Sequence, residues 1–324
     1  MSAVWILAEA RNGGLARISF ELATRALALT SEVNAVLISD ELSDAELQKL
    51  VDCGVSRVVA LESPAFKHFN AEPYAAALVE FIEREKPEAL IAGADSTGRT
   101  LMPYVAVRCH TGLTADCTVL ALEPETGLLL QTRPAIGGNI MATIKCAAHR
   151  PQMATIRPRS TRPAQPIAGG KGVIERVKVT AAKSRTEVKG FVPAEESAGI
   201  QDAECVVVVG RGIKRVEAMP MIEELAELLG AAVGGTREVI DRGFLSYPHQ
   251  VGLSGKTIMP KLYIGLGVSG AIQHLAGMQT AEHIIAVNRD PEAQIFKVAN
   301  AGIVGDLFEV VPEMIARLKK GGKI

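Results

Sequence analysis

Five loops rich in glycine and polar residues fall in the last third of the chain, and each follows an apolar run typical of a strand. In the first loop, Arg211 lies between two glycines directly after the run 205–209. A guanidinium and exposed backbone N–H groups at the carboxyl end of a strand suit a phosphate or pyrophosphate. A tight turn with a surface arginine would give the same pattern. Further on, Thr236 and Arg237 follow a glycine pair, and Ser254 is flanked by glycines that let a backbone approach a ligand.

Gly265, Gly267 and Gly270 form the pattern G-x-G-x-x-G, which is the spacing of a nicotinamide-dinucleotide finger. Such a finger follows the first strand of its βαβ unit and has an acidic residue about 20 positions further on. Here the strand is about the third of its domain, and the acid, Asp290, follows Asn288 and an arginine. A stand-alone NAD-dependent oxidoreductase is therefore an alternative function, and a redox-silent nucleotide sensor or scaffold is another.

The helix expected from Gly270 has an unusual first turn. Ser269 is placed to cap it, and Gln273 and His274 fall near its start. A histidine there could give a hydrogen bond or positive charge to an anionic ring system. A histidine satisfied within the fold is the plain alternative.

Two α/β domains are expected to position these loops. In the first, strands at 3–10, 33–40, 56–62 and 89–96 alternate with helices at 16–30, 44–54 and 71–86. Two strand-like runs follow, separated by Pro134 and by Gly137 and Gly138. The alternation predicts a parallel sheet covered on both faces.

The prolines and glycines of 150–172 predict loops or a passage between domains. The domains are predicted to span 1–200 and 201–324. The second is expected to be doubly wound, with strands at 204–212, 261–268 and 283–290 and helical segments at 215–230, from 270, and at 306–322.

Composition excludes several classes of protein. Of 324 residues, 48% are hydrophobic and 22% charged, which is typical of a globular protein. The 35 basic and 36 acidic side chains nearly balance, which argues against a nucleic-acid binder. Five scattered cysteines without a C-x-x-C pair favour neither disulfides nor a metal site. With no signal segment or membrane span expected, a cytoplasmic protein is predicted.

The stretches VVVVGRG, LYIGLGVSGAIQHLAGM, NRDPEAQIF and AGIVGDLFEVVPEM resemble the C-terminal signature of electron-transfer flavoprotein alpha subunits. The resemblance covers essentially the whole chain. It implies an N-terminal α/β domain, which packs against a beta subunit, and a doubly wound FAD-binding domain. It also implies an electron carrier that is active only as a heterodimer and exchanges electrons with an acyl-CoA dehydrogenase or another flavin dehydrogenase.

The resemblance also implies which residues contact FAD. Arg237, Ser254 and His274 would tune the flavin, with Ser254 near N5, His274 near the pyrimidine carbonyl, and Arg237 and His274 stabilising negative charge on the reduced ring. Asn288, Asp306 and Leu307 would hold the adenosine half. Many family members carry Gln-Thr where this chain has Leu253-Ser254. The full implied set is Arg211, Thr236, Arg237, Gln250, Val251, Gly252, Leu253, Ser254, Ser269, Gly270, Ala271, Ile272, Gln273, His274, Asn288, Asp306 and Leu307.

Residues 111–144, TGLTADCTVLALEPETGLLLQTRPAIGGNIMATI, resemble the clostridial, electron-bifurcating branch of the family. In that branch a second FAD, in place of AMP, sits in the beta subunit, and NADH oxidation is coupled to reduction of ferredoxin and of a second acceptor. The resemblance implies that Arg133 faces this second flavin.

Overall fold

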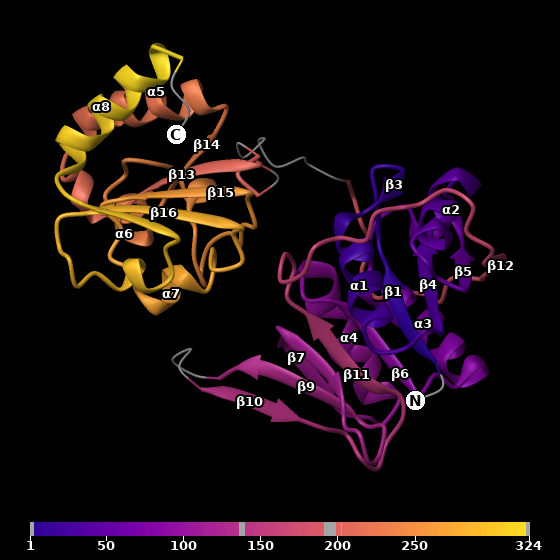
Figure 1. Ribbon diagram of the computed structural model, residues 1–324. Coiled ribbons are helices and arrows are strands. Elements are labelled where there is room, and N and C mark those ends of the chain that lie inside the picture. The colour runs from indigo at the N-terminus through magenta and orange to yellow at the C-terminus, as the bar shows by residue number, and fades with distance from the viewer. Residues whose placement is uncertain (1–2, 136–139, 191–198, 202, 322–324) are drawn as a thin grey trace. The chain divides into compact units, whose positions relative to one another are not determined.

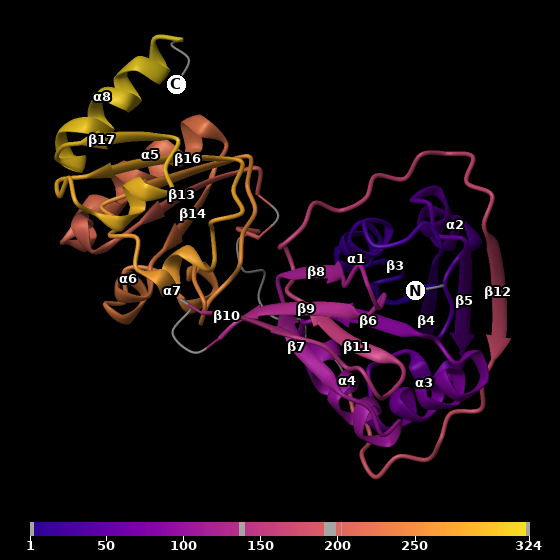
Figure 2. The same cartoon turned by 60° about the horizontal axis from the view of Figure 1, so that its bottom comes forward.

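The computed structural model describes residues 3–135, 140–190, 199–201 and 203–321. The chain forms two compact units, Met1–Val192 and Pro193–Ile324 (Figures 1 and 2). Each is built on a parallel sheet with further elements packed on both faces, which confirms the predicted α/β class. The sequence analysis placed the division after residue 200.

The sheet of the first unit has seven strands in the order β12-β5-β4-β1-β6-β11-β7, all parallel. The strands are β1 (Val4–Ala8), β4 (Val33–Ser39), β5 (Arg57–Glu62), β6 (Ala89–Gly93), β7 (Leu113–Cys117), β11 (Gln152–Ile156) and β12 (Val173–Lys178). The helices are α1 (Arg17–Leu27), α2 (Asp44–Asp52), α3 (Ala71–Glu85) and α4 (Ser96–Arg108), with a 3-10 turn, η1 (Pro64–Phe66).

Alternation along β1 shows how the sheet buries both faces. Ile6 and Ala8 lie in a core with α1 and α2, whereas Trp5 and Leu7 lie in a second core with α3 and α4. Successive side chains of a strand point to opposite faces, so an uninterrupted apolar run is what a two-sided parallel sheet requires.

The structure corrects the interpretation of 150–172. Residues Gln152–Ile156 are not a passage between domains but the fully buried strand β11, which pairs with β6 and β7. Its polar side chains satisfy buried backbone groups, because Gln152 Oε1 accepts a hydrogen bond from the Leu129 N–H at 2.8 Å and Thr155 Oγ1 accepts one from the Asp116 N–H at 3.0 Å.

The two strand-like runs predicted before residue 150 are β9 (Leu129–Pro134) and β10 (Met141–Ile144). With β8 (Val119–Leu122) they form a three-stranded antiparallel sheet in the order β10-β9-β8. Arg133 lies on β9 opposite Ala142. Gly137 and Gly138, which were expected to interrupt the strands, lie outside the described residues. A small hairpin, β2 (Ala10–Arg11) and β3 (Gly14–Leu15), follows β1.

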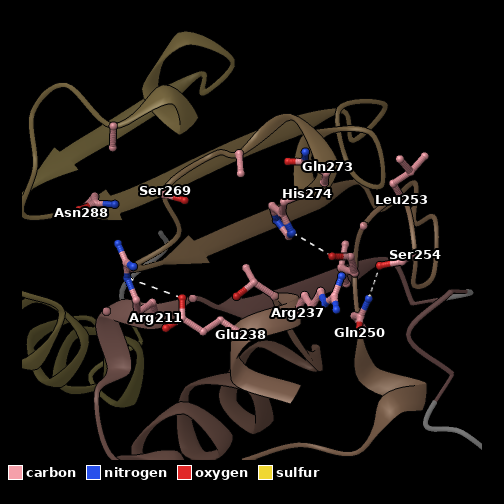
Figure 3. Close-up of a pocket in the computed structure, with 18 of the residues that line it drawn as sticks. Arg211, Arg237, Glu238, Gln250, Leu253, Ser254, Ser269, Gln273, His274 and Asn288 are labelled. Carbon is pink, nitrogen blue, oxygen red and sulfur yellow. Dashed lines mark hydrogen bonds and ion pairs between the residues drawn. The ribbon is translucent and has the colours of Figure 1, made fainter. Parts of the chain in front are cut away.

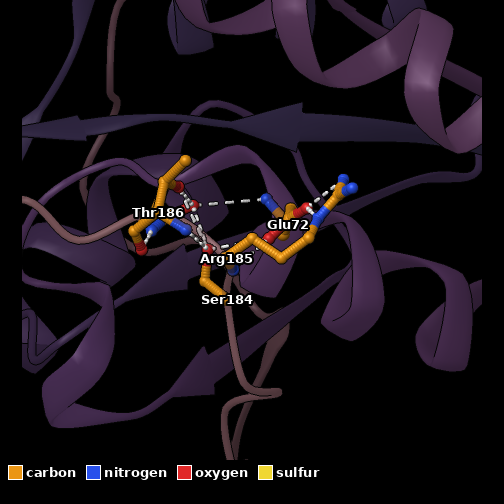
Figure 4. Close-up of polar contacts among 5 residues, drawn as sticks. Glu72, Ser184, Arg185 and Thr186 are labelled. Carbon is orange, nitrogen blue, oxygen red and sulfur yellow. Dashed lines mark hydrogen bonds and ion pairs between the residues drawn. The ribbon is translucent and has the colours of Figure 1, made fainter.

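Beyond β12, a short segment is tied to the start of α3. Glu72, in the first turn of α3, accepts hydrogen bonds from the Arg185 N–H at 2.7 Å, from Arg185 Nε at 2.6 Å and from Ser184 Oγ at 2.9 Å (Figure 4). The helix cap Asn70 donates from Nδ2 to the Thr186 carbonyl at 3.0 Å. The bonds from Arg185 and Ser184 lower the pKa of Glu72 to about 2, the backbone N–H of Arg185 contributing most.

The second unit has a parallel five-stranded sheet in the order β14-β13-β15-β16-β17. The strands are β13 (Cys205–Val209), β14 (Ala232–Gly235), β15 (Leu262–Leu266), β16 (His283–Asn288) and β17 (Ala301–Val304). The helices are α5 (Met219–Leu229), α6 (Arg237–Asp241), α7 (Ile272–Leu275) and α8 (Leu307–Lys319), with 3-10 turns η2 (Arg211–Ile213), η3 (Val216–Ala218), η4 (Tyr247–His249) and η5 (Gln294–Lys297).

The strand order places a topological switch point between β13 and β15. The chain leaves β13 for β14 on one side and returns to β15 on the other, so the connections run away from each other and open a crevice at the carboxyl ends. The helix predicted from Gly270 is only the short α7. Its N-cap residue is Ala271 rather than Ser269, and no side chain caps it.

Candidate cofactor site

A cavity of about 710 Å³ opens at the carboxyl ends of β13 and β15, at the switch point (Figure 3). It draws on all five loops that the sequence singled out. The predicted residues that line it are Arg211, Thr236, Arg237, Gln250, Val251, Gly252, Leu253, Ser254, Ser269, Ala271, Gln273, His274 and Asn288. The lining residues outside the implied set of FAD contacts are Gly210, Gly212, Glu238, Gly267, Asp290 and Ala293.

Glycines let the loops after β13 and β15 touch. The Gly210 N–H donates to the Leu266 carbonyl at 2.9 Å, and the Gly212 N–H donates to the Gly267 carbonyl at 3.1 Å. A Cβ on Gly210 would lie 2.3 Å from the Gly267 oxygen, and one on Gly212 would lie 2.7 Å from the Gly267 Cα. These contacts are with backbone, which cannot easily move. The sequence analysis noted the glycine pattern of both loops but did not include these three glycines among the FAD contacts.

One wall of the pocket is the loop between η4 and β15. Gln250 is buried and donates from Nε2 to Ser254 Oγ at 2.9 Å, while the Tyr247 hydroxyl donates to the Ser254 carbonyl at 2.8 Å. The loop turns at Gly252, whose φ of +148° favours glycine. Because Ser254 Oγ only accepts in these bonds, its own hydrogen stays available to a ligand.

Exposed charges also lie along the pocket, with Arg237 close to Gln250 (Figure 3). Arg211 Nε lies 3.7 Å from Glu238 Oε2, and Arg237 Nε lies 3.3 Å from Asp241 Oδ2, one turn along α6. Both arginine side chains are about three-quarters exposed, at 73% and 75%. They are therefore loosely held cations beside the cavity. Glu238 was not predicted to line the site, because in the sequence an acidic residue near two arginines is typical of an ordinary surface ion pair.

His274 behaves differently from these exposed groups. Only 6% of it is exposed, and both ring nitrogens contact protein atoms. Nδ1 lies 2.9 Å from the Val251 carbonyl, and Nε2 lies 2.7 Å from the Tyr263 hydroxyl. A carbonyl can only accept, so Nδ1 carries the proton and Nε2 accepts from Tyr263. Burial lowers the pKa of His274 to about 4, against the opposing effect of the Val251 hydrogen bond.

His274 is therefore neutral near neutral pH in this structure. The sequence analysis left two interpretations of this histidine open: a hydrogen bond or positive charge given to a ligand, or a ring satisfied within the fold. The burial of the ring and its two internal partners match the second, and the partner Tyr263 was not anticipated because it lies on β15 rather than in a loop.

Four predicted residues do not line the cavity. Gly270 packs against the backbone of residue 295, and Ile272 points outward from α7. Asp306 caps α8 by accepting from the Phe308 N–H at 3.0 Å and pairs with Arg289, which together lower its pKa. Leu307 is buried in the core beneath Gly267.

Asn288 does line the cavity, but its side-chain amide forms hydrogen bonds with backbone groups of the protein. It donates to the Val268 carbonyl at 2.7 Å and accepts from the Asp290 N–H at 3.0 Å. Among the described residues, no group of three or more His, Cys, Asp or Glu side chains could hold a metal ion. No helix in the described ranges has the length and apolar character needed to cross a membrane.

The geometry defines a class of protein. A cavity of this volume at a switch point, lined by glycine backbone, arginines and polar side chains, fits an α/β protein that binds an anionic dinucleotide cofactor. The glycine floor, formed by Gly210, Gly212 and Gly267, leaves room for a pyrophosphate. The apolar and polar side chains of the loop at 250–254 and of α7 suit a planar ring.

Comparison with known proteins identifies the particular family. Residues 4–182 match the model of the electron transfer flavoprotein domain, and residues 199–279 match that of the electron transfer flavoprotein FAD-binding domain. The chain is 43% identical to the electron transfer flavoprotein subunit alpha of Thermoanaerobacterium thermosaccharolyticum, over 98% of both chains. It is also 43% identical to that subunit of Clostridium acetobutylicum, over 98% of this chain and 96% of the relative.

A third relative is the lactate dehydrogenase (NAD(+),ferredoxin) subunit LctC of Acetobacterium woodii, which is 41% identical over 95% of this chain and 74% of its own. The chain belongs to the electron transfer flavoprotein family, as an alpha subunit with an FAD-binding second domain. This confirms the predicted family and the cofactor FAD. The family implies a heterodimer with a beta subunit and a dehydrogenase partner. A stand-alone NAD-dependent oxidoreductase is not favoured.

Proposed function

We propose that FAD lies along the cavity with its ring system against the loop at 250–254 and α7, and with its adenosine half toward Asn288. FAD supplies the electron-transfer chemistry, and the chain supplies binding, orientation and charge. The convergence of all five loops on one cavity at the switch point is the observation that carries this proposal.

The residues take different parts in this proposal. Arg211 faces the pyrophosphate, where a guanidinium is favourable, while the N–H groups of Gly210 and Gly212 are used in the contact between the two loops. Arg237 supplies positive charge beside the ring system, and Ser254 donates its free hydroxyl hydrogen to a ring nitrogen. Asp306 and Leu307 support the pocket without lining it: Asp306 caps α8, and Leu307 packs beneath the glycine floor.

The loosely held state of Arg237 suits this role. Among the described residues its guanidinium pairs only with the exposed Asp241, so it can turn toward the cavity without breaking a buried ion pair. A cation next to a ring that gains electrons favours the reduced state, because the attraction is stronger once negative charge is present.

We further propose that the chain belongs to the electron-bifurcating branch, in which NADH oxidation drives reduction of ferredoxin and of a second acceptor. In support, one relative of 41% identity is named as a subunit of a lactate dehydrogenase that uses NAD(+) and ferredoxin. Another, 40% identical and from Anaerotignum propionicum, is named an electron transfer subunit of acryloyl-CoA reductase.

Arg133 is the proposed link to the second flavin of the beta subunit. It lies on the three-stranded sheet of the first unit, and within the described part of the chain its guanidinium has no carboxylate within ion-pair distance. An arginine without a carboxylate partner among the described residues is suited to an anionic group supplied by another subunit.

The test is to count nucleotides in the purified alpha–beta heterodimer. Two FAD and no AMP per heterodimer support the bifurcating branch. One FAD and one AMP would contradict it while leaving the FAD site of this chain intact. A heterodimer without FAD would contradict the FAD site itself.

A further inference from the structure

Beneath the FAD pocket, His274 and Tyr263 form an isolated polar pair in an apolar core. Tyr263 is completely buried on β15, and His274 is held on α7. Their neighbours are apolar, as in the core formed by Val206, Val208, Ile258, Met278 and Ile284. His274 also lines the pocket, so it lies at the boundary between the apolar core and the proposed FAD site.

The hydrogen bonds around His274 allow two charge states without moving heavy atoms. Nδ1–H donates to the Val251 carbonyl in either state. Nε2 accepts from the Tyr263 hydroxyl when the ring is neutral. When the ring is protonated, Nε2–H can donate to the same oxygen, since a phenolic hydroxyl both donates and accepts and its hydrogen can turn to the other side in the ring plane. A phenylalanine at 263 would offer neither bond.

Burial is what holds His274 neutral. It lowers the pKa of His274 to about 4, and burial also raises the pKa of Tyr263. The charged groups on the pocket walls are Arg211, Arg237, Glu238 and Asp290, and Lys256 lies on the loop at 250–256. None of them contributes to the shift of His274. Its charge state is therefore open to whatever charge enters the pocket.

We propose that the His274–Tyr263 pair takes up one proton when the FAD in the adjoining pocket is reduced. This inference rests on the proposed placement of FAD. The electron comes from the dehydrogenase partner and the proton from water. One N–H bond forms at Nε2, and the Tyr263 hydroxyl turns from donor to acceptor. Tyr263 is thus a positioning residue that acts through His274.

The physical reason is electrostatic. Negative charge next to a buried imidazole favours its protonated form, and the interaction is strong where water is excluded. A protonated imidazole that donates to Tyr263 makes a charge-assisted hydrogen bond, which is stronger than the neutral one it replaces. Together these effects oppose the desolvation that keeps the ring neutral when the pocket carries no negative charge.

Nitrogen NMR of the FAD-loaded heterodimer with ¹⁵N-labelled histidine tests the inference. At pH 7 the oxidised protein should show His274 with a protonated Nδ1 and a bare Nε2. The reduced protein should show both nitrogens protonated. His249 serves as an internal reference, because its Nδ1 also lies 2.9 Å from a carbonyl oxygen, that of Val233, but its ring does not contact Tyr263. A neutral His274 in both states would overturn the inference.

Two tyrosine variants make the test specific. Tyr263→Phe should lower the ratio of protonated to neutral His274 in the reduced protein about tenfold, one pKa unit. Tyr74→Phe, which removes a hydroxyl that donates to the Phe66 carbonyl in the first unit, should leave it at the wild-type value. Equal protonation in Tyr263→Phe and wild type would overturn the role of Tyr263. If Tyr263→Phe does not fold, the wild-type comparison alone decides whether His274 takes up a proton.

FAD content is measured first, so that two failures are separated. A heterodimer without FAD contradicts the proposed function and this inference with it. A heterodimer whose FAD is bound and reducible, but whose His274 stays neutral, contradicts this inference alone.

Discussion

Replacing Arg237 by glutamine should lower the reduction potential of the FAD in this subunit. The substitution keeps a polar side chain of moderate length and removes only the charge. Because the arginine favours the reduced cofactor, its loss makes reduction harder. FAD content should stay close to wild type, since Arg211 and the glycine floor remain.

The size of the effect follows from the exposure of Arg237. A unit charge about 5 Å from the developing negative charge contributes about 3 kcal/mol at an effective dielectric constant near 20, and about 0.8 kcal/mol in water. The side chain is 75% exposed and lies 3.3 Å from Asp241, so the lower part of that range applies. We expect about 1–2 kcal/mol, which corresponds to about 40–90 mV for a one-electron step.

A redox titration of the purified heterodimer measures this shift. Arg317→Gln is a matched control, because Arg317 is 74% exposed and also pairs one helical turn away, with Glu313, but lies on α8 away from the cavity. The control should leave the potential at the wild-type value. An unchanged potential in Arg237→Gln, or an equal shift in both variants, would refute the role given to Arg237.

Two further predictions concern the first unit. Burial, followed by the charge of Asp95, raises the pKa of Glu9 to about 8, so the stabilising proton is fully present below about pH 4.5 and is lost as the pH rises through 8. At pH 8.5, Glu9→Gln should therefore raise the free energy of unfolding by on the order of 3 kcal/mol and so raise the urea midpoint, whereas at pH 4 it should change both little. The fluorescence of the single tryptophan, Trp5, follows the unfolding. A midpoint lowered at pH 8.5 would contradict the reasoning. Glu72→Gln should speed tryptic cleavage after Arg185 at pH 7, because the hydrogen bonds that tie Arg185 to the first turn of α3 become weaker. Cleavage at the wild-type rate would show that other contacts hold the segment.

The sequence predicts the strands that are apolar on both faces but misses β11. The runs that became β1, β4 and β13 could be recognised because a parallel sheet buried on both sides needs apolar residues throughout. In β11, Gln152 and Thr155 interrupt that pattern. Their side chains are buried because they bond to backbone groups of β7 and β9, which are distant in sequence.

The pocket was predictable to a similar degree. Residues in loops after strands were found, since the carboxyl ends of parallel strands meet at one edge. Asp306 and Leu307 were placed there by the resemblance, yet the structure uses them to cap and support α8. His274 was found, but its charge state was not, because that depends on a hydrogen bond to Tyr263 and on the depth of burial.

The central claim is that FAD occupies the cavity at the ends of β13 and β15, and FAD counting in two tryptophan variants of the heterodimer tests it most directly. Ala271 is exposed and lines the cavity, whereas its neighbour Ile272 is 41% exposed and does not. Ala271→Trp should fill the cavity and remove one FAD per heterodimer, while Ile272→Trp should retain the wild-type number. Full FAD content in Ala271→Trp, with the variant folded, would contradict the account.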